Sequence, residues 1–152
     1  MNWYGTLKVV HVLSVVAWIG AGMAFAMMTA RLIRERNRAT MAVFLPQTST
    51  YMQTVAGPAS LLVLLSGIAM VIVGRIGFAP LWISWGFAGM LVHFVFGATV
   101  MRKRMIALGQ AVASSASDDS ALAQAGARLR TAQLIYLIVM ASVIVVMVLK
   151  PA

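Results

Sequence analysis

Four long apolar runs, separated by more polar segments, limit the folds that this sequence can adopt. The first run, residues 7–29 (LKVVHVLSVVAWIGAGMAFAMMT), carries one lysine, one histidine and no acidic side chain. The hydrocarbon core of a bilayer is about 30 Å thick, and about 20 apolar residues of α-helix cross it. This run is therefore long enough to span a membrane, and its histidine would then lie inside the hydrocarbon region.

The composition excludes a soluble domain, because 62% of the residues are hydrophobic and only 10% are charged. Backbone N–H and C=O groups must pair within the protein in hydrocarbon, and a helix achieves this within one segment. We predict an all-α integral membrane protein, a four-helix bundle that forms one transmembrane domain over residues 1–152. The lipid bilayer is its expected partner.

The four expected membrane helices coincide with the apolar runs, at about residues 5–30, 55–74, 81–101 and 131–149. Two cytoplasmic loops are expected between them, at 31–54, where Pro46 would interrupt a helix, and at 102–130. The second loop could contain an Ala-rich surface helix that Asp118 and Asp119 cap.

The distribution of basic residues predicts the orientation of these helices. Nine of the 12 Lys and Arg residues fall in the two loops: Arg31, Arg34, Arg36, Arg38, Arg102, Lys103, Arg104, Arg128 and Arg130. Cytoplasmic segments carry such an excess, so both termini are expected outside, in a bacterial-type inner (cytoplasmic) membrane. Topology also explains the net charge of +9, and no nucleic-acid partner is expected. A long first run followed by four arginines is not typical of a cleaved signal peptide, so the first helix is expected to be retained.

The only two histidines, His11 and His93, both lie in expected membrane helices. An ionisable side chain at membrane depth is costly and is a functional hypothesis by default. His11 shares one helical face with Lys8, Trp18 and Gly22. Two interpretations stay open for this face: a packed surface on which the imidazole bonds a neighbouring helix, or a ligand to haem iron or copper. Lys8 could meet a haem propionate or extend to the interface.

His93 follows Gly86 and Gly89 at the spacing of one helical face. Small residues let helices approach closely, and the same lack of side chains would accommodate a flat macrocycle. Counted from the expected outer helix ends, His11 and His93 lie about 9 and 18 Å deep. This difference is awkward for two ligands of one iron. One histidine could ligate while the other contacts a substrate, a quinone or a second group.

Other chemistries are limited by what the sequence contains. It has no cysteine, which excludes disulfides, thiolate metal sites, iron–sulfur clusters and covalent c-type haem attachment. Its only acids, Glu35, Asp118 and Asp119, lie in expected loops, so neither a carboxylate pair nor a Ser-His-Asp triad is expected at membrane depth. The 12 methionines keep copper open as an alternative, because thioether and imidazole suit Cu(I), although methionine is also an adaptable apolar filler.

The pattern LKVVHVLSVVAWIGAGM, with Lys8, His11, Trp18, Gly20 and Gly22, is followed by GPASLLVLLSGIAMV and by Pro80-Leu81-Trp82. Over about residues 5–105 this order resembles CopD-like membrane domains, HemJ-type protoporphyrinogen oxidases and uncharacterised four-helix membrane proteins similar to both. The oxidase resemblance implies haem b bound through the first histidine and oxidation of protoporphyrinogen. Those oxidases have a lysine shortly after the tryptophan of the third helix, where this chain reads Trp82-Ile83-Ser84-Trp85-Gly86. The CopD-like resemblance implies copper passage.

The resulting hypothesis is a haem b-binding inner-membrane protein that serves electron transfer or porphyrin redox chemistry. His11 is the expected metal ligand, and His93 lines the same or an adjacent site. If the protein is an enzyme, it is a haem-dependent oxidoreductase. Two alternatives stay open: a copper-handling membrane protein, and a non-catalytic subunit that packs against a larger membrane complex or against copies of itself.

Overall fold

The regular elements of the chain are all helical in the part that the structure, a computed structural model, describes, residues 2–114 and 119–151. In order they are α1 (Trp3–Arg34), α2 (Arg38–Tyr51), the π-helical turn η1 (Met52–Ala56), α3 (Gly57–Val73), α4 (Leu81–Phe96), the π-helical turn η2 (Gly97–Met101), α5 (Arg102–Ala113) and α6 (Asp119–Leu149). Because η1 joins α2 to α3 and η2 joins α4 to α5, the chain forms four continuous rods. Each rod is long and apolar enough to cross a membrane.

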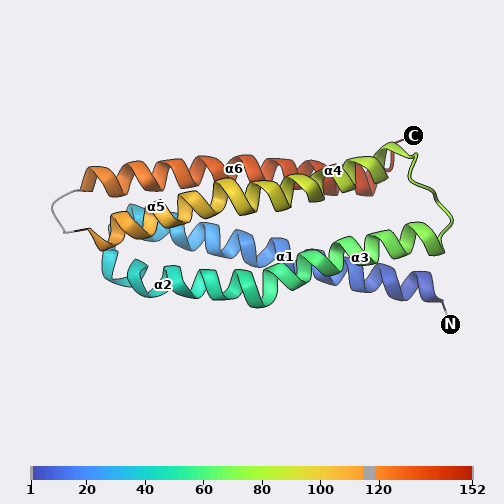
Figure 1. Ribbon diagram of the computed structural model, residues 1–152, viewed down its shortest axis with the longest axis horizontal. Helices are drawn as coiled ribbons and strands as arrows, with labels where there is room; N and C mark the ends of the chain where they lie inside the picture. Colours follow the sequence, from blue (N-terminus) through green and yellow to red (C-terminus); the bar gives the residue numbers. More distant parts are fainter. Residues whose placement is uncertain (1, 115–118, 152) are drawn as a thin grey trace.

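The four rods lie side by side along one long axis (Figure 1). Both chain termini lie at the end where the segment between α3 and α4 connects the second rod to the third (Figure 1). The predicted all-α bundle with four membrane spans is confirmed, and both termini share one end of it. Which side of the membrane this end faces stays a prediction from the basic residues.

The structure differs from the expected loops, because most of 31–54 and 102–130 is helical. Asn37 lies in the short turn after α1, and its side-chain oxygen accepts a hydrogen bond from Thr40 N (3.0 Å), which caps α2. Pro46 lies inside α2 without ending it. Buried Met41 and Thr48 hold the helix on both sides of the proline. The alanine-rich segment expected as a separate surface helix is the first part of α6, and the predicted cap by Asp118 lies outside the described residues.

Two clusters of buried side chains explain why the helices extend so far. One lies around Trp18 in the apolar part of the bundle and comprises Trp18, Ala56, Ala59, Val63, Met90 and Met140. The other lies in the end that carries most of the arginines and comprises Leu32, Met41, Leu108, Ala111, Leu122 and Leu129. The helical ends beyond the apolar runs thus have a core of their own.

The outer surface of the apolar part of the bundle exposes apolar side chains, as contact with lipid requires. Large apolar side chains such as Val16, Leu91 and Ile138 are 63%, 65% and 68% exposed, on three of the four rods. In water such a surface would be unfavourable, whereas lipid chains solvate it. The interior at the same depth combines Trp18 and aliphatic or methionine side chains with small and hydroxyl side chains such as Ala59 and Ser66, and both histidines are half-buried beside them.

Candidate functional site

The ring of His11 lies between α1 and α3, where its Nδ1 is 3.0 Å from Ser66 Oγ. The same Oγ lies 2.5 Å from the backbone oxygen of Leu62. Two oxygens at this distance repel each other unless a hydrogen lies between them, so the Ser66 hydroxyl donates to Leu62. Its oxygen then accepts from His11, which places the imidazole proton on Nδ1. The Nε2 atom of neutral His11 is therefore left with its lone pair.

Small residues on α3 allow this close approach of α1. Ser66 is buried, and a Cβ built on Gly67 would lie 3.5 Å from His11 Cε1. The imidazole edge therefore packs directly against the glycine. His11 itself is half-buried, and its imidazole also interacts with the backbone of Val63. A carbonyl oxygen can only accept, so with the proton on Nδ1 it shares that donor, and Nε2 keeps its lone pair to bind a metal or to accept a proton.

His93 has the opposite arrangement, between α4 and α6. Its Nδ1 lies 2.6 Å from the hydroxyl of Tyr136. No other acceptor for this hydroxyl is found within residues 2–114 and 119–151, so the phenol O–H donates to Nδ1. Nδ1 is then an acceptor, and the proton of the neutral ring lies on Nε2. Neither nitrogen of His93 offers a free lone pair in this arrangement.

Trp18, on α1, packs against the ring of His93. Its ring centroid lies 4.3 Å from that of His93 with an edge-on geometry, and the side chain is only 7% exposed. Trp18 follows His11 by seven residues on one helix, which is a rise of about 10 Å. His93 therefore lies about two turns from His11 along the bundle. The two imidazoles do not face each other across one cavity.

The glycines expected beside His93 lie in a helix–helix contact. A Cβ on Gly86 would lie 1.9 Å from Met147 Cε, and one on Gly89 would lie 2.3 Å from Val143 Cγ2. The face of α4 that carries both glycines is thus filled by side chains of α6. Small residues generally allow membrane helices to pack this closely.

The remaining predicted residues lie on α1 with different surroundings. Lys8 is exposed one turn before His11, and no ion pair or hydrogen bond engages it in the described part of the chain. Gly22 is half-buried, and a Cβ there would meet nothing within 4 Å. The structure therefore brings Lys8 and His11 together at one level and Trp18 and His93 together at another.

One protein family matches residues 5–151, which is nearly the whole chain: the predicted integral membrane proteins of DUF2269. The chain belongs to this family. No curated protein and no solved structure matches it. Membership agrees with the four membrane-length helices, so the protein is an integral membrane protein that contacts the lipid bilayer.

Sequence reasoning missed Ser66 and Tyr136, the two hydroxyl partners that distinguish the histidines. Each is a polar side chain inside an apolar run, and this was the available signal. Neither could be paired with its histidine without the helix register, because 55 and 43 residues separate the partners. No group of three or more His, Cys, Asp or Glu side chains that could hold a metal occurs among the described residues.

Proposed function

We propose that this DUF2269 protein binds haem b with His11 as a ligand to its iron and serves electron transfer or porphyrin redox chemistry in the membrane. The observation that carries the proposal is the hydrogen bond from His11 Nδ1 to Ser66, which leaves the Nε2 lone pair available. Histidines that bind metals generally donate their other ring N–H to an oxygen in this way. Haem iron is commonly held by a single histidine.

The described residues fit this group in one respect and fail to fit it in another. His11 would fit as a ligand to the iron, and exposed Lys8, one turn away, would be available to a propionate. His93 does not fit as a second ligand to the same iron, because it lies about two helical turns from His11 and its Nδ1 is occupied by Tyr136. The proposed site therefore lies on the α1–α3 side and has one protein ligand.

The chain's own residues would determine where and how the group is held. The Ser66 hydroxyl fixes the imidazole tautomer and orients the ring, and Gly67 lets the edge of the ring approach α3 closely. The surrounding apolar side chains of α1 and α3 would exclude water from the iron. Bound haem supplies one-electron redox chemistry, and the protein supplies ligation, orientation and dielectric. The likeness of the first helix to HemJ-type oxidases supports the same proposal, although the comparisons show no similarity to those oxidases or to CopD-like domains.

The test is the visible spectrum of the full chain, purified in mild detergent from haem-sufficient cells, with and without dithionite. We expect a Soret band in the wild type and in His93→Ala, and its loss in His11→Ala. His93→Ala is the matched control because it removes the same side chain from the same bundle. Loss of the band in His93→Ala with retention in His11→Ala would overturn the assignment of the ligand.

Metal analysis of the same preparations tests the haem proposal against its rivals. A colourless wild-type protein with stoichiometric copper would refute the haem proposal and support a copper-handling function. A colourless protein without metal, recovered together with other membrane proteins, would instead favour the non-catalytic subunit.

A further inference from the structure

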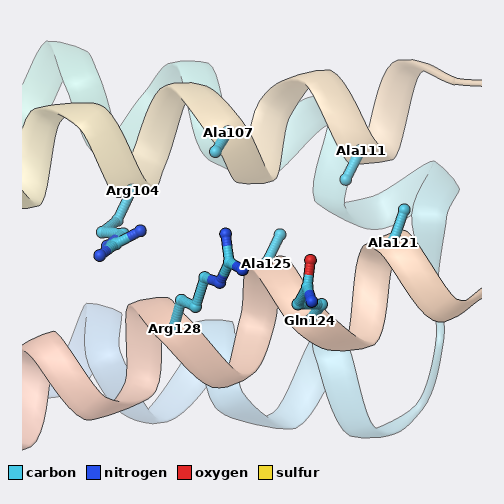
Figure 2. A pocket seen from close by; sticks show the side chains of 7 residues that line it. All are labelled: Arg104, Ala107, Ala111, Ala121, Gln124, Ala125 and Arg128. Atoms are coloured by element: carbon cyan, nitrogen blue, oxygen red, sulfur yellow. The ribbon is translucent and has the colours of Figure 1, made fainter.

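A hollow of about 270 Å³ lies between α5 and α6, at the end of the bundle that carries most of the basic residues. Its lining residues are Arg104, Ala107, Ala111, Ala121, Gln124, Ala125 and Arg128. Figure 2 shows Arg104 from α5 and Arg128 from α6 extending into the space between the two helices, with Gln124 farther along. The four alanines leave this space open because their side chains are short.

No carboxylate among the described residues neutralises the two guanidinium groups. The structure describes two acidic side chains, and both are already paired: Glu35 with Arg31 at 2.8 Å, and Asp119 with Arg36 at 2.6 Å and Arg38 at 3.5 Å. Neither Arg104 nor Arg128 makes an ion pair or hydrogen bond within the described part of the chain. Two like charges that face one hollow repel each other, and a bound anion would reverse this repulsion.

The depth of the hollow indicates which anion reaches it. From Leu81 to Met101 the third rod rises about 31 Å, close to the hydrocarbon thickness of a bilayer. Arg104 lies within one turn beyond that segment, and Arg128 lies one turn before the apolar part of α6 begins at Thr131. Both guanidinium groups are therefore at the level of lipid phosphates.

We propose that this hollow binds the phosphate of an anionic membrane lipid. Arg104 and Arg128 would engage the phosphate oxygens, because guanidinium groups match phosphate in two-bond geometry. Gln124 lies farther from the membrane, where its amide can bond a polar headgroup such as glycerol. The site is independent of the haem proposal, because it lies outside the apolar part of the bundle that holds both histidines.

The test measures lipid binding to the full chain in neutral detergent, with native mass spectra that count bound lipids during titration by phosphatidylglycerol or phosphatidylcholine. We expect tight binding of one phosphatidylglycerol. The double variant Arg104→Gln/Arg128→Gln should bind it about 30-fold more weakly, at about 1 kcal/mol for each basic residue. The matched control is Arg102→Gln/Arg130→Gln, which removes two exposed charges of the same rods outside the hollow.

A third variant tests the hollow without changing charge. Ala107→Leu would fill part of the space while both arginines remain, and circular dichroism would verify that it folds. We expect it also to weaken phosphatidylglycerol binding, whereas the control double variant should stay within about threefold of wild type.

Several results would overturn the proposal. Equal binding of phosphatidylcholine would show no preference for an anionic lipid, and equal losses in the two double variants would show only diffuse charge attraction. Displacement of the lipid by millimolar inorganic phosphate would identify free phosphate as the ligand in place of the lipid.

Discussion

Gly89 on α4 offers the sharpest test of the helix packing, because a single methyl group there would meet a stiff neighbour. A Cβ at Gly89 would lie 2.3 Å from Cγ2 of Val143 and 3.5 Å from its Cβ and Cγ1. Valine is β-branched and has one strongly preferred rotamer in a helix, so it cannot turn away at low cost. Gly89→Ala must therefore separate α4 from α6 or strain one of them.

The magnitude follows from two opposing effects. Replacing glycine by alanine inside a helix is favourable by about 1 kcal/mol, whereas overpacking a filled contact costs about 1–3 kcal/mol. With the rigid Val143 opposite, we expect overpacking to dominate and Gly89→Ala to lower the free energy of unfolding by about 1–2 kcal/mol.

Gly86→Ala is the matched control on the same face of α4. The atom that a new Cβ would meet is Met147 Cε at 1.9 Å, while Met147 Sδ lies at 3.6 Å. Methionine has three rotatable bonds, so this terminal methyl can swing aside. We expect Gly86→Ala to stay within about 1 kcal/mol of wild type, because the gain in helix propensity offsets the adjustment.

The assay is reversible unfolding of the purified protein in mixed micelles of dodecyl maltoside and SDS, followed by tryptophan fluorescence. A third variant, Gly89→Ala/Val143→Ala, should be less destabilised than the sum of its single changes, since the smaller side chain removes the clash. If Gly89→Ala were as stable as wild type, or less harmful than Gly86→Ala, the filled contact between α4 and α6 would be refuted.

Three further predictions concern single polar side chains. Tyr136→Phe leaves His93 Nδ1 without its donor, so we expect a loss of about 1 kcal/mol in unfolding free energy and an unchanged visible spectrum; a changed spectrum would contradict the packing role of His93. Ser66→Ala removes the acceptor that makes the His11 imidazole a more basic ligand, so we expect a higher midpoint potential or weaker retention of haem with little change in helix content, measured by redox titration and circular dichroism; an unchanged potential and full retention would contradict this role. Asp119→Asn should cost at most about 1 kcal/mol and less in high salt, because its shorter ion pair, with Arg36, is exposed, as unfolding at two salt concentrations would show; a salt-independent loss would contradict it.

The membrane fold could be predicted because its main constraint acts along the sequence. A bilayer requires apolar runs of a certain length, and such runs are visible without knowledge of any tertiary contact. The helical extensions were missed because the segments that form them are polar enough to resemble loops. Leu122 and Leu129, seven residues apart and both buried, carried the available signal of a packed helical face.

The candidate site could be predicted only in part, because the sequence does not give the register between neighbouring helices. The presence of His11 and His93 at membrane depth follows from the sequence, and their separation along the bundle follows from the rise of a helix. The partners of each ring lie on other helices, and their identity depends on rotation and sliding of those helices. Ser66 and Tyr136 could therefore not be assigned from spacing along the chain.

Ser66 and Tyr136 give His11 and His93 different hydrogen-bonding states, although the two side chains are chemically the same. A serine whose proton is already donated to the backbone can only accept from His11, which leaves the lone pair of that imidazole free. A half-buried tyrosine whose one acceptor among the described residues is His93 donates to that ring and uses its lone pair. The proposed ligand site at His11 and the packed site at His93 thus differ by the direction of one hydrogen bond. Because that direction is set by the neighbouring helix, the contact between α1 and α3 is the part of this bundle to which the proposed redox function assigns its ligand.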